Sequence, residues 1–237
     1  KQNIQIMQAG KDTVNAVTDA HTVNAMLGEF AEKTGLSLTD GQYNAALMLL
    51  TGKDRVSGIQ GYAGVGKTTL LSFVKYVAEK EGYTLKGISP TAAAGRKLED
   101  ETGIPSQTLE SFLIQTANEI KQSKSENAEQ SQQKALWILD ESSMASTRAF
   151  NGLVKQNQTL DTHLIALGDK KQLASVEAGK PFEQLQNAGM QTTVMKDIIR
   201  QKEGTRMKNA VLSAIDGRIN TALKNITAVR VIEDNEK

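Results

Sequence analysis

The stretch GYAGVGKTT, Gly61–Thr69, matches the pattern G-x-x-x-x-G-K-[ST] of a phosphate-binding P-loop. That pattern predicts a nucleotide site only where a strand precedes it and a helix follows it. Residues 55–60 have the length and composition of a short strand, and residues 69–81 carry apolar side chains at helical spacing. The surroundings of the motif therefore favour a true P-loop over a glycine-rich turn that matches by chance.

Each part of this loop has a physical role in binding a nucleoside triphosphate. Glycines let the backbone pass close to phosphate oxygens, and successive N–H groups at a helix N-terminus supply positive potential. We expect the ammonium group of Lys67 to reach the β- and γ-phosphates and the hydroxyl of Thr68 to hold Mg²⁺. The predicted nucleotide-binding residues of the loop are Gly61, Gly64, Gly66, Lys67, Thr68 and Thr69.

A second candidate site lies where an apolar run meets two acids. Ala135–Leu139 (ALWIL) predicts a buried strand with Trp137 in the core, and Asp140 and Glu141 follow it directly. In a P-loop NTPase, one acid at this position binds Mg²⁺ and the next orients and deprotonates the attacking water. We predict these roles for Asp140 and Glu141. The alternative is a pair of solvated acids, which the P-loop earlier in the chain disfavours.

The composition limits the class of protein. The chain has 237 residues, 39% of them apolar, a net charge of +1 and no cysteine. Disulfide frameworks and thiolate metal sites are excluded, and any nucleic-acid site must be local because the net charge is near zero. No apolar run approaches the roughly 20 residues of a membrane span. We therefore expect no membrane segment and a cytoplasmic location, and the start at Lys1 suggests a piece of a longer protein.

Four further features each allow two interpretations. Gln42 forms a T-x-x-Q capping box with Thr39, and its amide is also suited to read adenine because it donates and accepts together. Ser89–Thr91 is either an ordinary helix N-cap or a phosphate contact. Gln172 is either a plain loop residue or a γ-phosphate sensor, and Arg200 is either a surface residue or a phosphate clamp. From the residues alone these alternatives stay open.

Strands that alternate with helices predict an α/β fold with a mainly parallel sheet. With the motifs above, the chain resembles the first RecA-like core domain of a superfamily 1 helicase of the RecD-like, 5′→3′ class. Within that class it is most similar to the helicase part of conjugative relaxase–helicases of the TraI/TrwC type. The segments that carry the resemblance follow the family's order: Leu38–Gln42 (Q-motif), Gly61–Thr69 (motif I), Ser89–Ala94 (motif Ia), Asp140–Met144 (motif II), Gly168–Leu173 (motif III) and Ile198–Gln201 (motif IV).

The resemblance implies roles for residues that the pattern alone left open. It implies that Gln42 reads adenine while capping its helix, that Gln172 couples the γ-phosphate to DNA contact, and that Arg200 clamps the γ-phosphate. It implies that Thr91 and Thr108 contact the backbone of single-stranded DNA. The implied cofactors are ATP and Mg²⁺. The implied partners are single-stranded DNA, a second RecA-like domain of the same parent protein, and other conjugation proteins.

The same resemblance gives an expected domain organisation. A helical segment at 1–37 precedes the first RecA-like core domain at 38–216, which includes a polar loop at 117–134, and residues 217–237 begin the connection to a second core domain. Motifs V and VI of the family belong to that second domain, and no such domain fits in this chain. We therefore expect an ATP site with one wall missing, and little activity from this piece alone.

The expected function is that of an ATP-dependent DNA helicase or translocase core within a conjugative DNA-transfer relaxase. The relaxase nuclease itself is not in this chain, because His21 and His163 are too few for its metal-binding His cluster. The alternative is a vestigial helicase-like module that binds single-stranded DNA or a transfer partner without hydrolysis. The complete set of ATP motifs favours the active form. A P-loop kinase would leave the segments like motifs Ia and III unexplained.

Overall fold

The computed structural model describes residues 1–61, 64–125, 134–169 and 179–195. The chain forms two compact units, residues 1–61 with 67–195, and residues 62–66 with 196–237. The first unit contains the sheet and every helix described below. In the second unit, only residues 64–66 belong to the described part.

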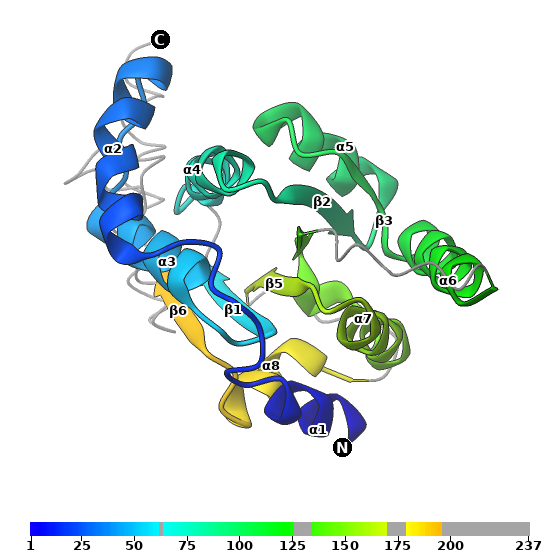
Figure 1. Ribbon diagram of the computed structural model, residues 1–237. Helices are drawn as coiled ribbons and strands as arrows, with labels where there is room; N and C mark the ends of the chain where they lie inside the picture. The colour runs from blue at the N-terminus through cyan, green and yellow to red at the C-terminus, as the bar shows by residue number, and fades with distance from the viewer. Residues whose placement is uncertain (62–63, 126–133, 170–178, 196–237) are drawn as a thin grey trace, which may run out of the picture. The chain divides into compact units, whose positions relative to one another are not determined.

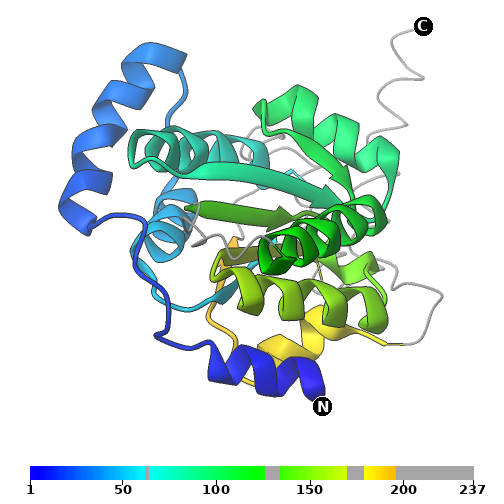
Figure 2. The same ribbon diagram turned by 45° about the vertical axis from the view of Figure 1, so that its right-hand side comes forward.

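The first unit is built on a sheet of six parallel strands (Figures 1 and 2), which confirms the predicted α/β fold. The spatial order is β3-β2-β4-β5-β1-β6. Every residue of β1, β4 and β5 is buried. The near-continuous apolar sequences of β4 and β5 are typical of strands that are covered on both faces of a sheet. The strand bounds are β1 Val56–Gly61, β2 Thr84–Ser89, β3 Ser106–Thr108, β4 Ala135–Leu139, β5 His163–Gly168 and β6 Thr192–Met195.

Helices cover both faces of this sheet. Figure 1 shows α3, α4 and α5 on one side and α6, α7 and α8 on the other, with α1 against α7 and α8. This division follows from right-handed crossovers. From β1 through β2 to β3 the chain crosses the sheet toward the β3 edge, and from β3 through β4 and β5 to β6 it crosses back toward the β6 edge, so the connecting helices lie on opposite faces. The helix bounds are α1 Gln2–Ala9, α2 Ala20–Thr34, α3 Asp40–Thr51, α4 Lys67–Lys80, α5 Ala92–Thr102, α6 Leu109–Ser125, the 3₁₀ turn η1 Ser142–Met144, α7 Thr147–Leu160 and α8 Pro181–Asn187.

Aromatic side chains mark the centre of each helix layer. Trp137 of β4 lies edge-on to Phe112 of α6, with 4.7 Å between ring centroids, and is 1% exposed, as predicted for a core residue. On the opposite face, Phe30 of α2 lies edge-on to Phe73 of α4 at 5.2 Å. The first contact packs α6 on β4, and the second packs α2 on α4, the helix that follows the P-loop.

Two parts of the chain differ from the expectation. Residues 117–125, assigned above to a polar loop, form the last turns of α6, because Glu119 accepts a hydrogen bond from Gln115 one turn earlier and lies 3.8 Å from Lys86 of β2. Residues 126–133 lie outside the described part. Ser106–Thr108, for which no strand is predicted above, forms the short edge strand β3.

Candidate nucleotide and DNA site

Predicted site residues that the structure describes lie at the carboxyl edge of the sheet, where Asp140 follows β4 and Thr108 ends β3. In a parallel sheet the carboxyl ends of all strands meet at the same edge, where ligands of open α/β folds bind. The strand register places Leu139 of β4 beside Ala166 of β5, and Gln60 of β1 beside Gly168 of β5. The segments that follow these strands therefore start side by side, and Asp140 and Asp169 are the first residues beyond β4 and β5.

The P-loop glycines have the backbone conformation that the motif requires. Gly64 and Gly66 have φ angles of 86° and 74°, in the left-handed region that favours glycine. The helix α4 begins directly afterwards, at Lys67. Tyr62 and Ala63 lie outside the described residues. The order strand, glycine turn, helix predicted from the sequence is thus confirmed.

Thr68, the predicted Mg²⁺ ligand, is half-buried in the first turn of α4. Its hydroxyl Oγ1 donates a hydrogen bond to the carboxylate oxygen Oε2 of Glu101, near the end of α5, at 2.8 Å. No local pattern predicts a role for Glu101, because its pairing with Thr68 depends on how α5 crosses α4.

The acid pair after β4 is held in a defined turn. The backbone N–H of Asp140 donates to the carbonyl of Ile88 at 2.9 Å, and its carboxylate Oδ1 accepts from the N–H of Glu141 at 2.9 Å. Glu141 itself has φ 49° and ψ 38°, an unusual left-handed conformation for a side chain of its size. Such residues cost of order 1 kcal/mol or more and cluster at functional sites, so this turn fits the catalytic role predicted for Glu141.

A serine joins this acid turn to the next strand. Ser143 Oγ donates to the carbonyl oxygen of Asp169 and accepts from its N–H, both at 3.0 Å. Asp169 is also bonded through Oδ1 to the buried amide of Gln60, at 3.2 Å. Sequence reasoning missed Ser143 and Gln60. A polar residue such as Gln60 inside a buried strand is the signal that could have found the latter.

Gln42 occupies the capping position that its spacing predicts. Its Oε1 accepts from the N–H of Thr39 at 2.9 Å, and the hydroxyl of Thr39 accepts from the N–H of Gln42 at 3.3 Å. The capping box is therefore confirmed, with Gln42 fully buried. The role in reading adenine stays a prediction.

The two predicted DNA contacts come from neighbouring strands. Thr108 ends β3 and pairs in register with Ser89, the last residue of β2, while Thr91 lies two residues beyond Ser89. Thr91 is exposed and caps α5 by accepting from the N–H of Ala94 at 3.2 Å, so the N-cap interpretation is confirmed. Thr108 Oγ1 bonds both the hydroxyl and the N–H of Ser111. Both threonines lie at the carboxyl edge, and DNA contact stays a prediction.

Two predicted γ-phosphate contacts, Gln172 and Arg200, lie outside the described residues.

The donors that are described suit Mg²⁺. A hydroxyl and a carboxylate, Thr68 and Asp140, are hard oxygen ligands of the kind that Mg²⁺ uses in small number beside phosphate oxygens and water. Within the described residues no group of three or more His, Cys, Asp or Glu side chains could hold a metal ion. A Mg²⁺ ion here would therefore also need oxygen ligands from phosphate or water. Taken by themselves, the positive-φ glycines Gly64 and Gly66 have the conformation of a phosphate-binding turn.

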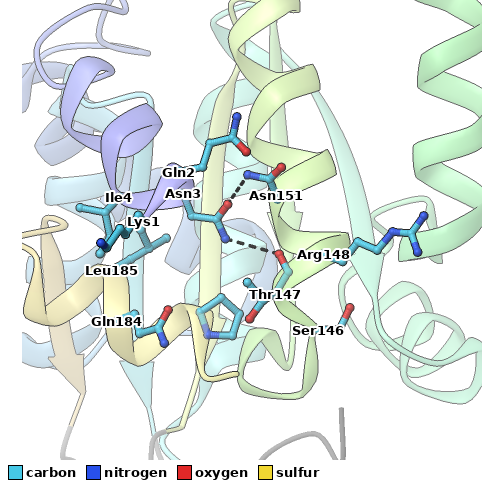
Figure 3. Close-up of a pocket in the computed structure, with 11 residues that line it drawn as sticks. Lys1, Gln2, Asn3, Ile4, Ser146, Thr147, Arg148, Asn151, Gln184 and Leu185 are labelled. Atoms are coloured by element: carbon cyan, nitrogen blue, oxygen red, sulfur yellow. Dashed lines mark hydrogen bonds between the residues drawn. The ribbon is translucent and has the colours of Figure 1, made fainter. Parts of the chain in front are cut away.

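A cavity of about 480 Å³ lies elsewhere in the first unit, between α1, α7 and α8 (Figure 3). Asn3 points between α1 and α7, where it donates to the carbonyl of Thr147 and accepts from the amide of Asn151. None of the predicted nucleotide or DNA residues lines this cavity.

Residues 37–237 match the family described as AAA domain. The chain belongs to the AAA-domain family. This AAA domain is similar to the "Multifunctional conjugation protein TraI" of Escherichia coli K12, at 34% identity over 208 residues, 86% of this chain and 11% of that protein. A second TraI from Escherichia coli is 32% identical over 82% of this chain and 11% of its own length. The "Probable conjugal transfer protein TraA" of Sinorhizobium fredii is 29% identical over 78% of this chain and 16% of its own length.

These similarities confirm the classification predicted from the sequence, a RecD-like helicase domain of the relaxase–helicase type. The AAA domain spans less than a fifth of the length of these relatives. Among its described helices, none is long and apolar enough to cross a membrane.

Proposed function

We propose that this AAA domain is the first half of an ATP-driven motor that moves on single-stranded DNA during conjugative transfer. The observation that carries the proposal is the common edge of the sheet. The turn with Asp140 and Glu141, the end of β5, Thr91 just beyond β2 and Thr108 at the end of β3 all lie there. Thr68 lies in the first turn of α4, the helix that follows β1. A nucleotide site and a DNA surface that share one edge can influence each other through short segments.

In the proposed chemistry the chain's residues position and neutralise charge. The Lys67 ammonium group binds the β- and γ-phosphates, and Thr68 and Asp140 hold Mg²⁺. When bound, Mg²⁺ would offset negative charge on the phosphate oxygens. Glu141 accepts a proton from the water whose oxygen attacks the γ-phosphorus, while the ADP oxygen leaves. Gln172 and Arg200 are proposed to contact the γ-phosphate, and Gln42 to read adenine.

The proposal includes the partners that such a motor needs. A second RecA-like domain supplies the opposite wall of the ATP cleft, so that ATP binding closes the cleft and hydrolysis reopens it. Other conjugation proteins deliver the strand, and the reaction takes place in the cytoplasm. The region described here is then expected to show little hydrolysis without that second domain.

The DNA part of the proposal is tested by binding of a fluorescent oligo-dT to the full-length protein. We expect Thr91→Val and Thr108→Val to weaken binding about 5-fold each, since each removes one hydrogen-bonding group from the phosphate contact. Thr159→Val, on the exposed face of α7, is the matched control. Affinity should fall steeply with salt in every variant. Unchanged affinity in both edge variants would contradict the proposed DNA surface.

A further inference from the structure

The hydrogen bond from Thr68 to Glu101 joins the proposed metal ligand to a residue that no motif includes. Thr68 is the second residue of α4, and Glu101 is the last residue but one of α5. The 2.8 Å separation between Oγ1 and Oε2 is that of a good O–H···O⁻ hydrogen bond. Because a carboxylate has no proton to give, Thr68 is the donor.

The direction of this bond matters for metal binding. A threonine hydroxyl that ligates Mg²⁺ offers an oxygen lone pair and keeps its proton, which then needs an acceptor. An acceptor of this hydrogen bond fixes the rotation of the hydroxyl and leaves the oxygen lone pairs facing elsewhere. Outer partners of this kind orient metal ligands and raise their basicity. A charged acceptor also adds negative potential close to the cation.

The position of Glu101 is set by the fold. The end of α5 is fastened to α4 by Lys75, whose Nζ donates to the carbonyl of Gly103 at 2.8 Å and reaches that of Thr102 at 3.4 Å. Gly103 ends α5 in the left-handed conformation, with φ 66°, and its carbonyl accepts the Lys75 bond. Lys97, one turn earlier, lies 4.0 Å from the other carboxylate oxygen of Glu101 and leaves Oε2 to Thr68.

We propose that Glu101 is a positioning residue for the Mg²⁺ of the nucleotide site, which it serves by accepting a hydrogen bond from the Thr68 hydroxyl and so directing the oxygen lone pair to the metal. The inference rests on the proposed function, since it assumes that Thr68 ligates Mg²⁺. It assigns a role in metal binding to α5, the helix that begins at the proposed DNA contact Thr91.

The test is a titration of Mg²⁺ into full-length protein that holds a fluorescent ADP analogue, repeated in EDTA. We expect Glu101→Gln and Glu101→Ala to raise the Mg²⁺ concentration at half-saturation. The expected change is about 10-fold, at the lower end for such partners because Glu101 is exposed. Affinity for the analogue in EDTA should stay the same. Asp100→Asn, which removes the adjacent exposed carboxylate of α5, should leave both values unchanged.

A double variant separates positioning from general charge. In a Thr68→Ala background, adding Glu101→Gln should change the Mg²⁺ midpoint no further, because the hydroxyl that Glu101 orients is gone. Equal midpoints in the wild type and both Glu101 variants would overturn the inference, as would a lower midpoint or an equal shift in Asp100→Asn. A wild-type protein that binds the analogue without any Mg²⁺ dependence would overturn the proposed function as well.

Discussion

The hydroxyl of Ser143 and the backbone of Asp169 form a reciprocal pair of hydrogen bonds, each 3.0 Å long. They tie the turn that contains Asp140 and Glu141 to the end of β5, from which the segment with Gln172 departs. Because one hydroxyl serves as donor and acceptor, a shift of the acid turn would also shift the backbone of Asp169, and the reverse. We infer that this link holds the acid turn against the end of β5.

Replacing Ser143 with alanine should lower DNA-stimulated ATP hydrolysis by about 10-fold, because the acid turn loses its connection to β5. The variant should also lose about 1–2 kcal/mol of stability, since the N–H of Asp169 loses its serine partner. Ser146→Ala is the matched control. It removes the N-cap of α7 at a cost of about 1 kcal/mol but leaves the Asp169 link intact. Equal hydrolysis rates in the two folded variants would show that the link has no catalytic role.

A side chain at Gly168 should destabilise the folded protein. A Cβ at this position would lie 2.7 Å from the hydroxyl oxygens of both Ser142 and Ser143, and 2.9 Å from the ring of Phe182. We expect Gly168→Ala to destabilise the protein by about 1–3 kcal/mol in urea unfolding. Gly28→Ala, in α2 with no atom within 4 Å of the added carbon, should instead stabilise it by about 0.5–1 kcal/mol. A neutral Gly168→Ala would mean that the packing around the end of β5 is looser than described.

Gln42 offers a way to separate capping from adenine recognition. Gln42→Glu keeps a capping box, since a carboxylate also accepts from the N–H of Thr39, but it removes the amide donor. We expect a loss of about 10-fold or more in affinity for ATP relative to GTP, together with a loss of stability, because position 42 is fully buried and a carboxylate there is costly. Thr39→Ala should lose about 1 kcal/mol in unfolding and retain the selectivity. Unchanged selectivity in Gln42→Glu would mean that Gln42 caps its helix and does not recognise adenine.

His163 should make stability fall in mild acid. Burial lowers the pKa of His163 below its usual value of 6.5, although the hydrogen bond to the carbonyl of Asn15 partly opposes this shift. The folded protein therefore binds fewer protons than the unfolded chain, so stability is full above pH 6.5 and declines as the pH falls below it. Urea unfolding from pH 8 to pH 5 should show less decline in His163→Gln than in wild type. The exposed His21→Gln is the control and should follow the wild type.

Local patterns predicted the elements around the nucleotide motif well. The glycine spacing and the flanking apolar periods identified β1 and α4, and the run Ala135–Leu139 identified β4, because each signal lies within a few residues of its element. The capping box of Thr39 and Gln42 was equally visible. These features depend on backbone geometry and burial that a short window of sequence encodes.

Contacts between distant segments could not be predicted in the same way. The pairs of Ser143 with Asp169, Thr68 with Glu101 and Gln60 with Asp169 each arise from the order of the strands and the crossing of helices. The strand β3 was missed because three polar residues give no alternation, and it exists by pairing with β2. The polar turns at the end of α6 were missed because their support comes partly from Lys86 of another strand.

We propose that the full-length protein hydrolyses ATP in response to single-stranded DNA, and its rate of ATP hydrolysis can be measured with and without that DNA. We expect single-stranded DNA to stimulate the wild type and Lys67→Ala to lose both binding and hydrolysis. Glu141→Gln should bind ATP yet hydrolyse it about 10²–10⁴-fold more slowly. Glu32→Gln, an exposed acid of α2, is the control. Wild-type protein that binds DNA without any stimulated hydrolysis would contradict the motor and favour the non-hydrolysing module, and full hydrolysis in Glu141→Gln would contradict its role as base.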